Sequence, residues 1–560
     1  MVQVVAGVPG KPRNEQIIVA MRLGIATSEI EGKDDRQLSQ KIQDKVYDGM
    51  VQEAMSLTAG SEATIREHFP TVDALGSLLQ ERTKFNDPDT SRELFIARQW
   101  TKNEQSGIAR PFTPNDVFTL RGTIPQDGFS YGKHTANRFR HMLRTEPYVL
   151  AFGGVSGHEA GNMIEGGSKG KGRLKAQYVG GYYTAADKNT DGRPCPDILI
   201  DASTSVPRNV NELRNSFTQF DKNDHAEGNH TINWAVPIIA DGDTGYGVEK
   251  HVGFHMLRLG EAGVAGVHFE DQLSEEKVCG HLRVGNKVLI PVNLFIDKLG
   301  AAQEQIDIMD TDTVLIGRTD AEGAGYITYN DLNSIDRNFI DNTRERHRKG
   351  YYPIKGGLDL AIARAIAFAP YVDMIWFEST YPDLEQAKEF ARAIQAVYPD
   401  KPLAYNLSPS FNWNGYFTKK ILAEMKMTEQ EYASANKTTH DLVEATVKYQ
   451  VCNFTEELGK AGYKFQFGTY EALRRRNFDI FRLSYEFSNN GMAAWIDHER
   501  EENEAVQHLG YRWHRTNERT GATYWDKFAA AATSGDTSGS CMNTACETVQ
   551  FAGAQVTIKT

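Results

Sequence analysis

The feature that most constrains this fold is a regular alternation of short apolar segments and longer helix-like segments, which begins at Tyr148. Eight apolar segments of five to eight residues recur, separated by stretches whose apolar residues have helical spacing. This alternation is typical of βα units around a parallel sheet, and eight units predict an α/β fold with a TIM-type (β/α)8 barrel. The expected strands cover residues 149–153, 177–181, 237–241, 266–271, 313–320, 372–379, 402–408 and 464–469.

Both flanks of the barrel have the spacing of helices. Residues 1–146 are polar and predict a helical N-terminal extension, the barrel domain is expected over 147–476, and a C-terminal helical arm over 477–560. The individual segments expected in these flanks are helices over 35–55, 63–80, 478–502 and 523–532, and a Ser/Thr/Gly-rich tail over 533–548 that could serve as a mobile loop or be disordered.

Charge and composition exclude several classes of partner. The net charge of -12 over 560 residues argues against a nucleic-acid surface, which needs a basic face. No run of about 18 apolar residues occurs, so no membrane span is expected. Five widely spread cysteines and the lack of a secretory signal at the N-terminus indicate a reducing, cytoplasmic location.

Polar residues stand at the ends of most of the expected strands. A TIM barrel carries its catalytic groups at the carboxyl ends of its strands, whereas packing would favour apolar residues there. The pattern therefore predicts a site for a small-molecule substrate at this end of the barrel. The residues concerned are Asp241, Glu270, Arg318, Asp320, Glu378, Asn406, Ser408 and Thr469.

The third strand ends in a glycine-rich turn with two carboxylates. Asp241 and Asp243 are two residues apart, so both can face one cation with water between them. Hard oxygen ligands that leave room for water suit Mg²⁺, and Glu270 could complete its outer shell. A capped surface turn without a metal is the alternative reading of the same residues.

A thiol follows the fourth strand between two potential cations. Cys279 has Lys277 two residues before it and His281 two residues after it, which should lower the pKa of the thiol. Such a thiol could give or take a proton near neutral pH. A buried packing cysteine beside Gly280 is equally compatible with this spacing.

The other strand ends offer groups that bind carboxylates. Arg318 can hold a carboxylate bidentately, although a structural salt bridge with Asp320 or Glu378 would explain it as well. Asn406, Ser408 and Thr469 are neutral donors that could hold a substrate carboxylate without adding charge.

Seven motifs in order resemble those of the isocitrate lyase family, from about Tyr148 to the C-terminus. They cover residues 240–247, 268–273, 277–281, 318–322, 376–378, 404–413 and 465–469. The resemblance implies a TIM-like barrel that uses Mg²⁺, with Mn²⁺ as an alternative. It implies retro-aldol (Claisen-type) cleavage of isocitrate to glyoxylate and succinate in the glyoxylate shunt. It also implies a homotetramer that swaps C-terminal helices, with the Cys loop and the C-terminal tail closing over substrate.

The resemblance also implies roles for individual residues. Cys279 would be the acid that protonates the succinate carbanion, with Lys277, His281 and Arg318 as further catalytic groups, and the base is not assigned. Asp241 would bind the metal, with Asp197, Asp243 and Glu270 around it. The substrate would contact Gly181, Tyr182, Gly280, His281, Arg318, Glu378, Asn406, Ser408, Ser410 and Thr469.

Three departures from the family pattern leave two alternative functions open. Val278 stands where relatives have a second Lys, Gly180 and Tyr182 replace a Ser and a Trp on the glyoxylate side, and Asp243 replaces a Glu. One alternative is 2-methylisocitrate lyase, which forms pyruvate and succinate in the methylcitrate cycle, because Tyr182 could make room for a methyl group. The other is a catalytically weak regulatory homologue.

Overall fold

The computed structural model describes residues 112–280, 286–329 and 333–535, together with eight isolated positions between 37 and 66. The helices expected over 35–55 and 63–80 therefore lie almost entirely outside the described residues, as do His281 and most of the tail over 533–548. The chain divides into two compact units, of which the larger comprises residues 125–218 and 234–514.

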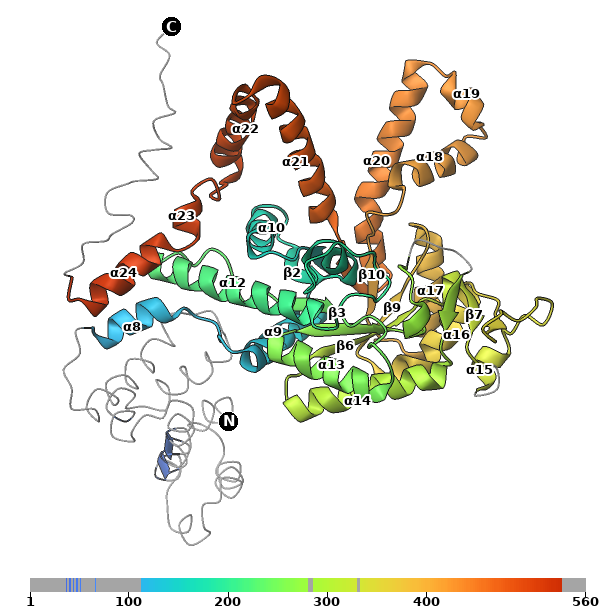
Figure 1. Cartoon of the computed structure of the whole chain (residues 1–560), viewed down its shortest axis with the longest axis horizontal. Coiled ribbons are helices and arrows are strands. Elements are labelled where there is room, and N and C mark those ends of the chain that lie inside the picture. The colour runs from blue at the N-terminus through green and yellow to red at the C-terminus, as the bar shows by residue number, and fades with distance from the viewer. Residues whose placement is uncertain are drawn as a thin grey trace. The chain divides into compact units, whose positions relative to one another are not determined.

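The larger unit is built on a closed barrel of eight parallel strands, which confirms the predicted fold (Figure 1). Around the barrel the strands follow the order β1-β11-β10-β9-β6-β4-β3-β2. Each expected strand is present, with ends that differ by a few residues. The strands are β1 Val149–Gly153, β2 Leu174–Val179, β3 Ile238–Asp241, β4 Gly266–Glu270, β6 Val314–Thr319, β9 Met374–Phe377, β10 Leu403–Asn406 and β11 Tyr463–Phe467.

Helices connect the strands on the outside of the barrel, as βα units require. The segments that follow β10 and β11 contain helices that project away from the barrel in Figure 1. The helices of these connections are α10 Gly157–Lys169, α11 Gly181–Tyr183, α12 Ser205–Glu227, α13 Glu249–Ala262, α14 Val292–Met309, α15 Ser334–Arg337, α16 Leu358–Phe368, α17 Leu384–Val397, α18 Trp413–Glu424, α19 Glu429–Ala433, α20 Lys437–Lys460, α21 Glu471–Asn490 and α22 Ala493–Leu509.

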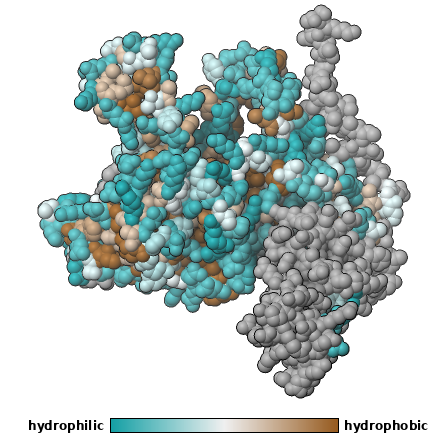
Figure 2. Space-filling model, turned by 180° about the vertical axis from the view of Figure 1, so that it is seen from behind, coloured by the Kyte–Doolittle hydropathy of each residue, from teal (hydrophilic) through white to brown (hydrophobic). Residues whose placement is uncertain are grey.

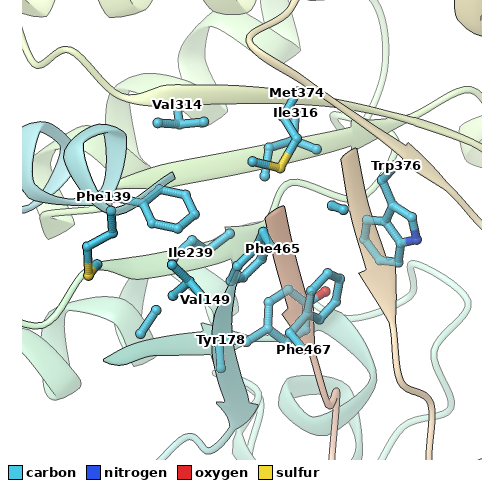
Figure 3. Close-up of a cluster of buried hydrophobic side chains, with 14 residues drawn as sticks. Phe139, Val149, Tyr178, Ile239, Val314, Ile316, Met374, Trp376, Phe465 and Phe467 are labelled. Carbon is cyan, nitrogen blue, oxygen red and sulfur yellow. The ribbon is translucent and has the colours of Figure 1, made fainter. Parts of the chain in front are cut away.

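The interior of the barrel is filled with apolar side chains, and helix α9 (Gly128–Thr145) packs against its amino end. Figure 3 shows Phe139 of α9 beside Val149, Ile239, Val314 and Phe465. The ring of Phe139 meets that of Phe465 edge to face, with centroids 5.2 Å apart. Because apolar side chains fill this end, the carboxyl end of the barrel is left for polar chemistry.

A small second sheet, which was not predicted from the sequence, lies in the loops after β4 and β6. Its strands β5 (Lys287–Leu289), β7 (Ala324–Ile327) and β8 (Tyr352–Pro353) have two to four residues, too few for a periodic pattern. Lys287 at its edge is fully buried and forms an ion pair of 2.6 Å with Asp320. This ion pair thereby ties strand β5 to the residue that follows β6.

The segment after the barrel differs from the single helix expected over 478–502. Two helices, α21 and α22, form a hairpin there because Gly491 adopts a left-handed φ of 56°, which ends α21. Glycine takes this conformation without the clash that a Cβ would cause. The expectation of one continuous helix was therefore wrong.

The smaller unit contains short helices and the end of α12. Its helices α8 (Pro114–Arg121), α23 (Thr516–Arg519) and α24 (Ala522–Ala532) include the one expected over 523–532. A buried ion pair of 2.9 Å joins Arg519 to Asp224.

Among the described residues, no helix is both long and apolar enough to cross a bilayer. The face in Figure 2 is largely hydrophilic, with scattered hydrophobic patches.

Candidate active site

The register of the barrel brings the predicted polar residues to one level. Asp241 pairs with His268 on the next strand, and Glu270 pairs with Arg318. Arg318 in turn pairs with Trp376. Neighbouring parallel strands that end together therefore place their last side chains around a common space at the carboxyl end of the barrel.

Four carboxylates form an acidic cluster on one side of this space: Asp197, Asp241, Asp243 and Glu270. Lys277 reaches into the cluster and is buried. Its ammonium lies 2.7 Å from Asp243 and also forms an ion pair with Asp197. Gln272 donates to Glu270 over 3.0 Å. Lys277 therefore acts as an internal counter-ion in this structure.

The loops after β2 and β3 hold Asp241 in place through backbone amides. Gly181 donates to one carboxylate oxygen over 2.9 Å, and Asp243 donates to the other over 2.8 Å. A Cβ at Gly181 would lie only 3.0 Å from Asp241 and 3.2 Å from Asp243, so the backbone lies directly against both carboxylates. A side chain at position 181 would therefore crowd the acidic cluster, and glycine allows this close approach.

Burial dominates the electrostatics of the cluster. It raises the pKa of Asp241 to about 7, with the charge of Asp243 adding to the effect. Burial also raises the pKa of Glu270 well above its usual range, despite the nearby Arg318. For Lys277 burial acts in the opposite direction, but Asp197 and Asp243 outweigh it and raise the pKa of the ammonium. Lys277 is therefore charged at neutral pH, and Asp241 lies close to its titration point.

The carboxylates of the acidic cluster are residues that could hold a divalent cation largely through water. Within the described residues no three such side chains converge directly on one point, and Mg²⁺ commonly keeps several waters between itself and protein oxygens. Excess negative charge in a buried site is costly, and a divalent cation would offset it. Around the site six carboxyl groups lie near three cations, Lys277, Lys287 and Arg318, and burial together with this crowding raises the pKa of Asp241 and of Glu270. The six groups are Asp197, Asp241, Asp243, Glu270, Asp320 and Glu378.

Arg318 lies across the middle of the site and is almost fully buried. Its guanidinium is bidentate to Asp320, at 2.8 and 3.1 Å, and lies 3.2 Å from Glu270. It also stacks over the ring of Trp376, 4.4 Å from the centroid. The structural salt bridge with Asp320 considered from the sequence is present. The same guanidinium also borders the cavity, and its role in holding a substrate carboxylate stays a prediction.

The thiol loop enters the same space. Cys279 is 8% exposed and lines the cavity together with Gly280. A Cβ at Gly280 would lie 2.3 Å from Glu378 and 2.6 Å from Arg318, so the loop backbone rests directly on these two side chains. His281 lies outside the described residues, and its place in the site stays a prediction.

The neutral donors gather on the opposite side, in the loops after β10 and β11. Asn406, Ser410 and Thr469 border the cavity, whereas Ser408 lies behind them and is fully buried. The Ser408 hydroxyl accepts the backbone N–H of Ser410 over 3.1 Å and shapes this loop. The cavity is thus flanked by charged groups on one side and neutral donors on the other.

Several residues that line the cavity were not predicted as site residues. Tyr178 is hydrogen-bonded to His268 over 2.8 Å, and Trp376 lies beneath Arg318. Tyr470 stacks on Tyr182. Tyr178 and Trp376 occupy inward-facing strand positions that also suit core packing, and Tyr470 stands at the start of helix α21. Their residue types therefore did not indicate that they line the cavity. The cavity is lined by Tyr178, Gly180, Gly181, Tyr182, Asp197, Asp241, Cys279, Gly280, Arg318, Trp376, Glu378, Asn406, Ser410, Thr469 and Tyr470.

Comparison with known proteins identifies the relatives of this chain. The sequence profile of the isocitrate lyase family matches residues 94–345 and 333–430. An isocitrate lyase of Halalkalibacterium halodurans is 37% identical over 81% of this chain and 97% of its own length. An isocitrate lyase of Corynebacterium efficiens is 36% identical over 79% of this chain and 94% of its own length. Isocitrate lyase 1 of Mycobacterium tuberculosis is 35% identical, over 78% and 92% respectively.

The matches cover nearly the whole length of these relatives, and the family profile spans seven of the eight barrel strands, from β1 to β10. The family expected from the seven motifs is therefore confirmed. This chain belongs to the isocitrate lyase family, and it is a lyase.

Proposed function

We propose that this enzyme cleaves isocitrate to glyoxylate and succinate in the glyoxylate shunt, in a reaction that depends on Mg²⁺ or Mn²⁺. One observation carries the proposal. A buried thiol, a buried Arg and two carboxylates of the acidic cluster, Asp197 and Asp241, border the same cavity as a set of neutral donors. This is the combination that cleavage of a hydroxylated tricarboxylate between two carbon atoms requires.

The two sides of the cavity suit the two halves of the substrate. The half that becomes glyoxylate carries the hydroxyl and its neighbouring carboxylate, which belong beside Arg318 and the acidic cluster. When bound there, a divalent cation would polarise the oxygen that becomes the aldehyde. The succinate half carries two carboxylates, and Asn406, Ser410 and Thr469 can donate hydrogen bonds to them.

The reaction itself needs one base and one acid. A base takes the hydroxyl proton, the C2–C3 bond breaks, and its electron pair stays on C3 as a carbanion delocalised into the adjacent carboxylate. Arg318 offsets the negative charge on the glyoxylate half. The thiol of Cys279 then gives its proton to C3, which completes succinate and leaves a thiolate. We leave the base unassigned, and we propose that His281 and Lys277 tune the charge around the thiol.

A glyoxylate-release assay tests this function. Purified protein with isocitrate and Mg²⁺ should release glyoxylate and succinate in equal amounts, and chelation of the metal should abolish the release. Running 2-methylisocitrate in parallel, with pyruvate as the product measured, distinguishes the nearest alternative. Release of neither product by a folded protein would favour the catalytically weak homologue that Val278, Gly180 and Tyr182 suggest.

We further propose a homotetramer with swapped C-terminal helices, located in the cytoplasm. The helical hairpin α21–α22 supports the assembly, because it exposes large apolar side chains such as Phe481 and Tyr485. On this view residues 1–146 are a helical extension, residues 147–476 the catalytic barrel, and residues 477–560 the arm and lid.

A further inference from the structure

We infer that Tyr470 is a specificity-determining residue, which together with Tyr182 forms an aromatic wall that selects a substrate with hydrogen, and not methyl, at C2. This inference rests on the proposed function, because it concerns the same cavity and the same cleavage. It assigns the chain to isocitrate over 2-methylisocitrate. Tyr470 lies directly after Thr469 and opens helix α21.

The wall is a defined structure of two rings and one hydrogen bond. The rings of Tyr182 and Tyr470 stack with centroids 4.3 Å apart and planes inclined by 27°. The hydroxyl groups of Tyr470 and Ser410 are hydrogen-bonded at 2.5 Å. Tyr470 is 8% exposed. A ring fixed by a stacking partner and by a hydrogen bond at its far end has little freedom to make room for a larger ligand.

The position of the wall places it beside the reacting carbons. Tyr182 follows Gly181, whose amide binds Asp241, so Tyr182 adjoins the side of the cavity that takes the hydroxyl half of the substrate. Tyr470 is bonded to Ser410, on the side that takes the carboxylates of the succinate half. The bond to be cleaved joins these two halves and therefore passes in front of the wall.

Electrostatics supports the same placement. Burial raises the pKa of Tyr182 and of Tyr470, and the charge of Cys279 contributes to the rise at both residues. Both phenols therefore lie near the thiol that would protonate C3. A substituent on C2 lies one bond further along, within the part of the cavity that the two rings border.

The aromatic wall changes what Tyr182 implies about the space for a methyl group. A Tyr in place of the Trp of relatives would by itself leave room for one methyl group. In this chain the ring of Tyr470 covers the face of Tyr182 and takes up space at that side of the cavity. The fit of one methyl group in an apolar pocket changes kcat/KM by about 10- to 200-fold. The filled wall therefore predicts rejection of the methyl substrate by about that factor.

The experiment compares kcat/KM for isocitrate and 2-methylisocitrate, with Mg²⁺, in the full-length enzyme and three variants. The wild type should favour isocitrate by about tenfold or more, and Tyr470→Ala should reduce that ratio by about tenfold or more. Tyr470→Phe retains the ring and should keep the ratio within about threefold of the wild type, while KM rises because Ser410 loses its partner. Tyr449→Ala, at a position on α20 that is 69% exposed, is the matched control and should leave kcat/KM for both substrates unchanged.

A wild type that prefers 2-methylisocitrate, or a folded Tyr470→Ala enzyme with an unchanged ratio, would overturn the inference. A protein that cleaves neither substrate would contradict the proposed function. The selectivity of the aromatic wall would then be tested by measuring ligand binding. Calorimetric titration with glyoxylate and with pyruvate serves this purpose, because these two oxo acids differ by the same methyl group. The wild type should bind glyoxylate more tightly than pyruvate, and Tyr470→Ala should reduce the ratio of the two dissociation constants. An equal ratio in both proteins would refute the role of the aromatic wall in selectivity.

Discussion

At the scale of single residues, charge in the site is balanced across a network and not within separate pairs. Lys277 bridges Asp197 and Asp243, and Arg318 contacts both Asp320 and Glu270. Removing one member of such a network leaves several buried charges without compensation. A substitution that only displaces a side chain should therefore affect the whole site.

Gly280→Ala is a sharp test of this coupling. The added Cβ would lie 2.3 Å from Glu378 and 2.6 Å from Arg318, so both side chains or the thiol loop must shift. A shift of about 1 Å near reacting groups can cost about a hundredfold in rate, and we expect kcat/KM to fall by roughly that factor. The midpoint of thermal unfolding should also fall, because Arg318 and Glu378 are buried members of this network.

The matched control is Gly300→Ala in helix α14, where a Cβ would meet nothing within 4 Å. This variant should keep full activity and gain about 0.5–1 kcal/mol of stability, as helical Gly→Ala replacements do. Equal activities of the two variants would show that Gly280 does not hold the loop against Arg318 and Glu378.

The sequence could predict residues of the site whose position follows from topology. Asp241, Glu270, Arg318 and Asn406 end strands of a barrel, and the ends of parallel strands meet. Tyr470 could not be found in this way, because its role depends on a stacking partner from a loop far away in the sequence.

At the scale of elements, the junction between β11 and α21 shows how a local choice of residues shapes the site. The carboxyl group of Glu471 fills the space beside Gly468, where a Cβ would lie only 1.9 Å from its oxygen. Thr469 and Tyr470, which line the cavity, lie between these two residues. The glycine and the carboxyl group therefore fix the path of the chain that presents both side chains.

Burial raises the pKa of Glu471 from 4.5 to about 7, against the opposing effect of the backbone amides of Glu471 and Tyr470. Because the folded state holds the proton more tightly than the unfolded state, the contribution of this group to stability is complete below about pH 4.5 and is lost as pH rises through 7. Glu471→Gln keeps the shape without the charge. We expect it to be more stable than the wild type at pH 8, by at most about 3 kcal/mol, and equal to it near pH 4.5.

Denaturant unfolding of both proteins from pH 4.5 to 8.5 measures this difference. Glu457→Gln is a suitable control, because Glu457 is exposed enough for solvent to screen its pairs with Lys388 and Lys460. A constant difference between wild type and Glu471→Gln across this range would mean that Glu471 does not titrate in the folded protein near pH 7.

The elements of the barrel could be predicted because each strand and helix carries its own period in the sequence. The strands β5, β7 and β8 could not, because two to four residues carry no period and their pairing depends on contacts between distant loops. The break at Gly491 was missed for a related reason. The apolar spacing continues through the turn, and a single glycine inside a helical pattern is often tolerated.

At the scale of the whole molecule, the helical hairpin α21–α22 has an apolar face that the described chain leaves open. Phe478, Phe481 and Tyr485 follow the three- and four-residue spacing of one side of α21 and are 58%, 71% and 66% exposed. Soluble proteins rarely expose a row of this kind unless another protein surface covers it. A second copy of this chain is the partner that the proposed helix-swapped tetramer supplies.

The double substitution Phe481→Glu with Tyr485→Glu tests that assembly, because it puts two charges where the partner's apolar surface would pack. Light scattering after size exclusion should give the wild type a mass of four times the 62.6 kDa of one chain, and the variant a smaller assembly. Burying an unpaired carboxylate costs several kcal/mol, which is enough to dissociate an interface of ordinary strength.

Ile308→Glu is the control, at a position of α14 that is 69% exposed and apart from the hairpin, and it should leave the mass of the assembly unchanged. A wild type that elutes as a single chain would refute the tetramer, and a variant that remains tetrameric would show that this face of α21 is not in the interface.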